Sequence, residues 1–78
     1  MIRRTLSTII TFDKTVEAMA AEAFAREKGV PGRLIPVPTN ITAGCGLAWK
    51  AQPSEKELVC EAFSAGGIHW KEAYVLEV

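Results

Sequence analysis

The stretch GRLIPVPT, residues 32–39, decides the fold because it combines a strand-like apolar run with two prolines. Pro36 and Pro38 lie two positions apart, so in a strand their missing N–H groups would point toward the same side. A strand that lacks donors on one side belongs at the edge of a sheet. We therefore predict that residues 32–39 form an edge strand and that the rest of the chain completes the sheet.

Three other segments have the pattern of strands. Residues 5–12 alternate in polarity, with Leu6 and Ile10 on one face, which predicts a strand with one better-buried face. Residues 46–51 predict a further strand, and a final strand is expected from about residue 70 to residue 78.

A helix is predicted between the first two strands. Asp13 is the expected N-cap, and Lys28-Gly29 supplies a basic last turn followed by a terminating glycine. The apolar stripe expected to face the core consists of Val16, Met19, Ala20, Ala23 and Phe24.

A second helix is predicted after Pro53. Ser54 and Glu57 have the spacing of a capping box, and Gly66-Gly67 ends the helix. Its expected apolar face consists of Leu58, Val59, Ala62 and Phe63. Cys60 lies beyond the edge of that face, and we interpret it as an incidental thiol.

The order strand–helix–strand, repeated once, predicts an α+β fold. This order of elements is typical of a ferredoxin-like βαββαβ sandwich, in which an antiparallel four-stranded sheet (order 4-1-3-2) carries two helices on one face. The second strand is an edge in this topology, as its prolines require. We expect residues 1–78 to form a single domain. Such a short chain buries only about 60% of its unfolded surface, so a homodimer remains an open alternative.

Composition argues against several classes of partner. Nine basic residues balance nine acidic ones, whereas nucleic-acid-binding proteins usually carry a basic excess. No apolar run approaches the length of a membrane span, and residues 1–14 are too polar for a signal peptide. The expectation is a cytoplasmic protein with no nucleic-acid or membrane partner, no metal and no cofactor.

Cys45 is the main candidate for chemistry, and it stands between Gly44 and Gly46. In the predicted topology the third strand begins beside the end of the first strand, where the first helix starts. We therefore expect Cys45 near that helix N-terminus, where the dipole favours an anion and lowers a thiol pKa. The two glycines would bend the loop and leave the sulfur accessible.

Four other residues are candidates for the surroundings of an anion or thiolate: Lys14, Arg33, Thr39 and Asn40. His69 is a weaker candidate, since it is expected to begin the last strand at the same end of the sheet. A structural interpretation stands beside this one, because a free cysteine is usually a small buried hydrophobe and glycines suit any hairpin.

The run Arg33-Leu34-Ile35-Pro36-Val37-Pro38, followed after a short loop by Cys45-Gly46-Leu47, resembles the selenium/sulfur carrier-like family of small bacterial proteins. The resemblance extends from Thr8 to Val78. It implies that Cys45 carries sulfur or selenium as a persulfide or selenenyl sulfide, and that the partners are donor and acceptor proteins. Family members often have a basic residue directly after the second proline, where this chain has Thr39.

Three functions are compatible with these sequence features. The first is a cytoplasmic sulfur/selenium carrier or delivery protein, as opposed to a turnover enzyme, that acts through Cys45. The second is a non-catalytic module that binds a small ligand or another protein, with Cys45 in a structural role. The third is a thiol redox protein that uses Cys45 with Cys60, which the lack of a CxxC motif disfavours.

Overall fold

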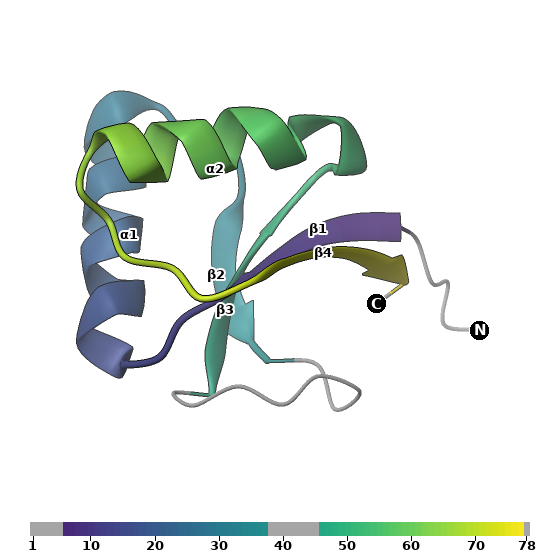
Figure 1. Ribbon diagram of the computed structural model, residues 1–78, viewed down its shortest axis with the longest axis horizontal. Coiled ribbons are helices and arrows are strands. Elements are labelled where there is room, and N and C mark those ends of the chain that lie inside the picture. The colour runs from purple at the N-terminus through teal and green to yellow at the C-terminus, as the bar shows by residue number, and fades with distance from the viewer. Residues whose placement is uncertain (1–5, 38–45, 78) are drawn as a thin grey trace.

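An antiparallel four-stranded sheet and two helices make up the fold in the computed structural model, which describes residues 6–37 and 46–77 (Figure 1). The elements are β1 (Leu6–Thr11), α1 (Thr15–Lys28), β2 (Arg33–Pro36), β3 (Leu47–Ala51), the short 3-10 helix η1 (Pro53–Glu55), α2 (Lys56–Ala65) and β4 (Ala73–Glu77). The order of the elements agrees with the prediction, and the α+β class is confirmed.

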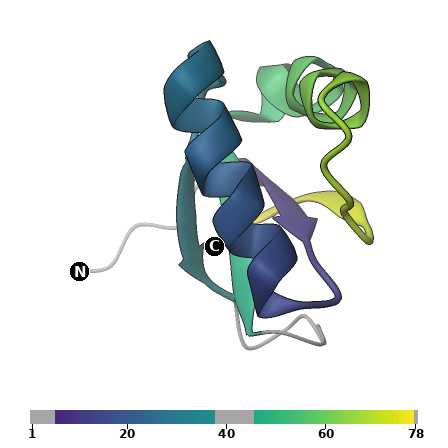
Figure 2. The ribbon, with the colours of Figure 1, turned by 90° about the vertical axis from the view of Figure 1, so that its left-hand side faces the viewer.

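The strand order is β2-β3-β1-β4, which is the predicted order read from the other edge. β2 lies at an edge, which suits Pro36, because a proline has no backbone N–H to donate to a neighbouring strand. Figures 1 and 2 show the two helices crossing steeply rather than running alongside each other. The narrower expectation, a ferredoxin-like sandwich with both helices on one face, stays a prediction.

Phe63 of α2 lies at the centre of an aromatic cluster in the core. Its ring centroid is 6.4 Å from that of Phe12, 6.2 Å from Phe24 and 5.7 Å from Trp49. These rings come from α2, the end of β1, α1 and β3, so one side chain joins both helices to the sheet. Tilted and edge-on ring pairs of this kind add to the gain from apolar burial.

β1 is buried on both faces, so the expectation of one better-buried face is wrong. Ile10 faces the aromatic core, yet Ser7, Ile9 and Thr11 on the opposite face are also buried. β1 pairs with β3 along one edge and with β4 along the other, so side chains of two neighbouring strands flank its own on each face of the sheet.

The apolar stripe predicted for α1 is mostly on the wrong face. The residues buried against the core are Ala18, Ala21 and Ala25, whereas Val16 and Met19 are 65% and 61% exposed. Of the predicted stripe only Phe24 packs against the core; Ala20 and Ala23 are exposed. Small alanines let the helix backbone approach the sheet closely, and the aromatic side chains then fill the space between the layers.

The start of α2 also differs from the prediction. The chain enters it through η1, and Glu55, not Glu57, reaches back, accepting a hydrogen bond from the Gln52 backbone N–H at 2.9 Å. Pro53 suits this entry because its missing N–H would have no helical partner. Val59 and Phe63 are buried as expected, but Leu58 is 54% exposed.

The glycine signals at the ends of the helices are confirmed. α1 ends at Lys28, and Gly29 follows in the left-handed region with φ of 73°. α2 ends at Ala65, immediately before Gly66-Gly67. Both stops depend on local backbone chemistry, which explains why the sequence predicts them well.

Candidate functional site

The predicted site residues divide into two groups. Thr39, Asn40, Gly44 and Cys45 lie outside the described residues. The structure places Lys14, Arg33, Gly46 and His69, whose positions relative to the beginning of β3 can be compared with the prediction.

Gly46 directly precedes β3 and is exposed. Its carbonyl accepts a hydrogen bond from the Val37 N–H at 2.9 Å, which closes the β2–β3 ladder. Its φ is 78°, and a Cβ there would meet none of the other residues that the structure describes within 4 Å. Two residues later, Ala48 pairs with Thr11, the last residue of β1. The start of β3 therefore lies beside the end of β1, which confirms the topological part of the prediction.

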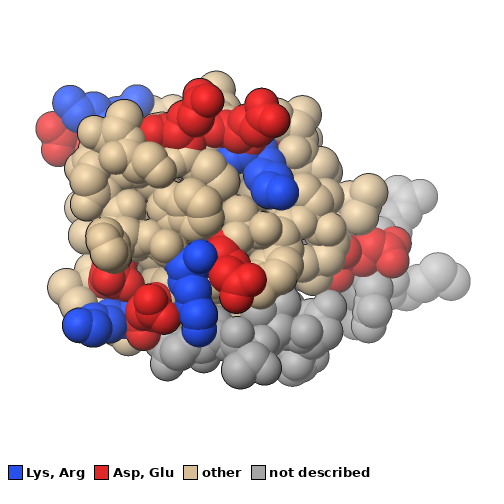
Figure 3. Space-filling model, viewed as in Figure 1, with Lys and Arg blue, Asp and Glu red and all other residues tan. Residues whose placement is uncertain are grey.

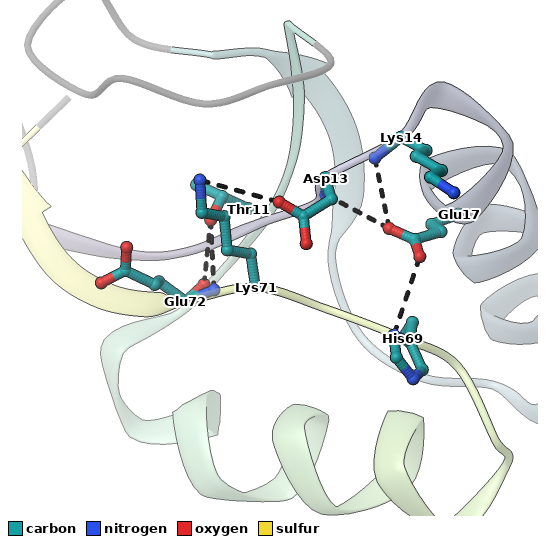
Figure 4. Close-up of polar contacts among 7 residues, drawn as sticks. All are labelled: Thr11, Asp13, Lys14, Glu17, His69, Lys71 and Glu72. Carbon is teal, nitrogen blue, oxygen red and sulfur yellow. Dashed lines mark hydrogen bonds and ion pairs between the residues drawn. The ribbon is translucent and has the colours of Figure 1, made fainter.

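The start of α1 is organised by Glu17, a residue that the sequence reasoning did not single out. One oxygen of its carboxylate accepts the backbone N–H groups of Asp13 and Lys14, each at 3.2 Å (Figure 4). Lys14 is the N-cap and has an extended backbone, but its side chain has no oxygen with which to cap the helix. The helix therefore begins with a carboxylate of its own, where its dipole favours negative charge.

Asp13 is not the N-cap, contrary to the prediction. It lies one residue before the cap, and its carboxylate oxygen is 3.7 Å from the Nζ of Lys71. The cap fails to form at Asp13 because the helix starts one residue later, where Glu17 is in the third helical position and can reach back.

His69 does not begin β4, which starts at Ala73. The structure nevertheless brings it to the start of α1, where its Nδ1 lies 3.7 Å from the other carboxylate oxygen of Glu17 (Figure 4). The His69 side chain is 87% exposed, so this pair is open to solvent.

Residues 71–72 anchor this corner to the end of β1. The Lys71 N–H donates to the Thr11 carbonyl at 2.7 Å, and the Thr11 N–H donates to the Glu72 carbonyl at 2.8 Å. The Thr11 hydroxyl also accepts from the Glu72 N–H at 3.2 Å. The two chain segments are therefore held together from β1 to the beginning of α1.

Charges of both signs meet at this corner. Asp13, Glu17 and Glu72 supply three carboxylates, while Lys14 and Lys71 supply two ammonium groups. Figure 3 shows the two signs interspersed at the lower left of this face. An added anion would gain from the lysines and the helix dipole, and the three carboxylates would oppose it.

Arg33 begins β2, as predicted, but it lies at the other end of the β2–β3 hairpin. It pairs with Lys50, whereas Val37, four residues further along, bonds to Gly46. Four strand residues span about 13 Å. The structure therefore does not bring Arg33 to the beginning of β3.

Cys60 is a free, half-buried thiol on α2, at the margin of the core. Burial raises its pKa, and the positive charge of Lys56 offsets part of that rise. Its thiolate is consequently scarcer at neutral pH than that of an ordinary cysteine, which agrees with its interpretation as incidental.

Sequence reasoning missed Glu17, Lys71 and Glu72. The sequence does contain a pattern that indicates Glu17, since a glutamate three residues after an N-cap is typical of a helix start. No sequence pattern indicates Lys71 and Glu72, because their contacts with Thr11 and Asp13 join residues far apart in the sequence.

Within residues 6–37 and 46–77, neither helix is both long and apolar enough to cross a membrane. In the same ranges, no three His, Cys, Asp or Glu side chains gather in a way that would hold a metal ion.

Comparison with known proteins gives one match. No curated protein and no solved structure matches the chain. A family model described as "Putative Se/S carrier protein-like" matches residues 7–75, from β1 into β4. Since this match takes in both helices, the hairpin and the glycine-flanked cysteine, the chain belongs to the family of Se/S carrier-like proteins.

Proposed function

We propose that this protein is a sulfur or selenium carrier that acts through Cys45 and passes its cargo between a donor and an acceptor protein. Family membership supports the class of function. The observation that carries the choice of residue is the position of Gly46, which is bonded to Cys45 and directly precedes β3 beside the end of β1. The start of α1 follows only a few residues after that end.

The transfer requires only thiol chemistry. The Cys45 thiolate attacks the terminal sulfur of a donor persulfide, forming a new S–S bond while the donor's own S–S bond breaks and the donor leaves as a thiolate. An acceptor thiolate then attacks the same terminal sulfur and releases Cys45 as a thiolate. No net oxidation occurs in either step, so no other reactant is needed. Selenium follows the same course through an S–Se bond.

The corner at the start of α1 supplies two features that such a thiol needs. Lys14 and Lys71 are exposed cations that, with the helix dipole, favour a thiolate over a thiol, whereas the three carboxylates of the corner oppose it. Gly46 has no side chain and is exposed, and among the described residues nothing lies within 4 Å of where a Cβ would be, which favours the approach of a partner protein. A carrier needs access more than a deep pocket, because its reaction occurs at the surface of another protein.

Loading by a persulfide donor tests the proposal. Wild type, Cys45→Ser and Cys60→Ser are incubated with glutathione persulfide, and the intact mass is followed for the gain of one sulfur atom. We expect wild type and Cys60→Ser to be loaded and Cys45→Ser to stay unloaded, with all three folded by circular dichroism. Equal loading of Cys45→Ser and wild type would overturn the assignment.

Transfer onward is the second half of the test. The loaded Cys60→Ser variant is mixed with a small acceptor thiol, and the sulfur is expected to leave Cys45 and appear on the acceptor. Retention of the sulfur on Cys45 would identify a dead-end modification and would contradict a carrier function.

A further inference from the structure

A second feature lies at the end of the β2–β3 hairpin remote from Gly46. An open cavity of about 670 Å³ lies between the first residues of β1, the start of β2, the end of β3 and η1. This volume is within the range of roughly 300–1,000 Å³ that is typical of small-molecule sites. Apolar and polar groups both line it, so it suits a ligand that has one apolar part and one polar part.

Arg33 and Lys50 bring two positive charges to this cavity. They are direct partners in the antiparallel β2–β3 ladder, so their side chains leave the same face of the sheet. Like charges directly opposite each other in a sheet repel. In the part of the chain that the structure describes, neither side chain forms an ion pair.

The acidic residue of the lining does not neutralise this pair by direct contact. Glu55 also borders the cavity, but one oxygen of its carboxylate accepts the Gln52 N–H at 2.9 Å. Two cations and one carboxylate leave the described lining with an excess of one positive charge.

Hydrogen bonds to core residues hold the walls in place. The indole Nε1 of Trp49 donates to the Pro31 carbonyl at 2.9 Å, and the hydroxyl of Thr8 donates to the Gln52 carbonyl at 2.8 Å. Between them, Gly32 packs so tightly that a Cβ would come within 2.4 Å of the Lys50 carbonyl oxygen. Two parts of the cavity wall, the backbone at Pro31 and the backbone at Gln52, are therefore each held by a hydrogen bond from a buried side chain.

We propose that this cavity binds a small organic anion whose carboxylate or phosphate group lies between Arg33 and Lys50. The guanidinium of Arg33 can bind either group through two parallel hydrogen bonds, and Lys50 adds a point charge. The apolar part of the ligand would pack on Leu6, Pro31 and Pro53. An anion there relieves the repulsion between the two cations, which otherwise persists in the free protein.

This site is separate from the one proposed for sulfur transfer. Arg33 lies about 13 Å along β2 from the residue that bonds to Gly46. The residues of the corner at the start of α1 do not line this cavity, so either proposal can fail without affecting the other. The ligand would give the protein a small-molecule binding function in addition to the carrier function.

A titration followed by two-dimensional ¹⁵N NMR tests the proposal. The probes are phenyl phosphate and benzoate, each with an anionic head and an apolar body, and inorganic phosphate, which has the head alone. We expect saturable shifts at the amides of Gly32, Arg33, Lys50 and Gln52 with at least one aromatic probe, and weaker binding of inorganic phosphate. If no probe gives saturable shifts at these amides in the millimolar range, the proposal is wrong.

Two matched double variants distinguish binding of the anion in this cavity from non-specific attraction of the anion to positive charge on the protein. Arg33→Gln/Lys50→Gln removes the two cations of the cavity, and Arg26→Gln/Lys28→Gln removes an exposed arginine and an exposed lysine of α1, neither of which lines it. We expect the first variant to bind at least about tenfold more weakly and the second to stay within about twofold of wild type. Equal weakening in both variants would overturn the proposal. Failure of the first variant to fold would also overturn it, because removing the repulsion should not destabilise the free protein.

Discussion

Glu17 accepts the backbone N–H of Lys14 at 3.2 Å, and this contact ties the start of α1 to its first turn. The same oxygen also accepts the N–H of Asp13, so one carboxylate serves two backbone donors. His69 approaches its other oxygen from a segment 52 positions later in the sequence. One side chain thus combines a helix cap with a link between distant parts of the chain.

The cap contributed by Glu17 should be measurable as stability. We expect Glu17→Ala to lower the free energy of unfolding by about 1 kcal/mol, because two backbone N–H groups lose their acceptor. Urea unfolding followed by circular dichroism measures the change. Glu27→Ala is the control, since Glu27 is an exposed acidic residue near the other end of the same helix. Equal destabilisation by both variants would show that Glu17 has no special role.

The backbone of Gly32 leaves no room for a side chain. Its φ is 113°, and a Cβ would lie 2.4 Å from both the Lys50 carbonyl oxygen and the Trp49 Nε1. We expect Gly32→Ala to destabilise the protein by about 2 kcal/mol or more, through backbone strain and a displaced strand edge.

Gly29→Ala is the matched control for Gly32→Ala. Gly29 also has a positive φ, but a Cβ there meets nothing within 4 Å. Its substitution should cost only the backbone term of about 1 kcal/mol. If the two variants unfold at the same urea concentration, the close contact at Gly32 has no energetic consequence.

The repulsion between Arg33 and Lys50 predicts an unusual gain in stability. Lys50→Glu turns a like-charged cross-strand pair into an opposite pair, and we expect it to stabilise the free protein by about 0.2–1 kcal/mol. Thermal unfolding at low salt measures the effect, which should shrink as salt is added.

A double-mutant cycle isolates this pair from other effects of the substitution. Arg33→Glu alone should also stabilise the protein, whereas Arg33→Glu/Lys50→Glu restores a like-charged pair and should lose the gain. Additive effects of the two single variants would mean that the side chains do not interact.

The raised pKa of Cys60 predicts that the stability of the protein depends on pH. Burial raises the pKa of its thiol, so the folded state favours the protonated form. The resulting stability is fully present below the pKa of the unfolded thiol, about 8.5, and is lost as pH rises through the higher folded pKa. We therefore expect the free energy of unfolding of wild type to fall more steeply than that of Cys60→Ser above about pH 8.5.

Substitution of Lys56 tests how much its charge offsets the rise in the Cys60 pKa that burial causes. Its positive charge lowers the Cys60 pKa, so Lys56→Gln should raise that pKa further. Alkylation of Cys60 by iodoacetamide, resolved by peptide mass spectrometry across pH, measures it directly. A Cys60 midpoint unchanged by Lys56→Gln would exclude the attraction as a significant cause.

Phe63 and Leu58 test which face of α2 is buried. Phe63 is fully buried among three aromatic rings, and Phe63→Ala should destabilise the protein by about 3–5 kcal/mol. Leu58 is 54% exposed, and Leu58→Ala should change stability by less than about 0.5 kcal/mol. Urea unfolding of the two variants compares them, and a large loss in Leu58→Ala would place that side chain in an interface.

The edge position of β2 and the helix ends were predictable because they depend on local rules, and the strand order followed from the repeated strand–helix–strand pattern. A proline at position 36 excludes a central strand, and a glycine at position 29 allows the left-handed turn that ends a helix. The position of Gly46 beside the end of β1 followed from that strand order alone. These features need no knowledge of side-chain packing.

The charged corner at the start of α1 was only partly predictable. Lys14 was expected there on the basis of sequence position, but the contacts of Asp13 with Lys71 and of Glu17 with His69 join segments 58 and 52 positions apart. Likewise, the opposition of Arg33 and Lys50 depends on the register of the β2–β3 ladder. Register is set by long-range pairing, which a single sequence does not reveal.

The sequence by itself determined which segments become strands and helices, where the helices end and which strand lies at the edge, because backbone conformation and hydrogen-bonding capacity are properties of each residue. Only the tertiary structure decided which face of α1 is buried. Val16 and Met19 are more hydrophobic than Ala18 and Ala21, yet the alanines face the core. The volume of the four aromatic rings leaves space there only for small side chains, and that constraint exists only once the layers are packed together.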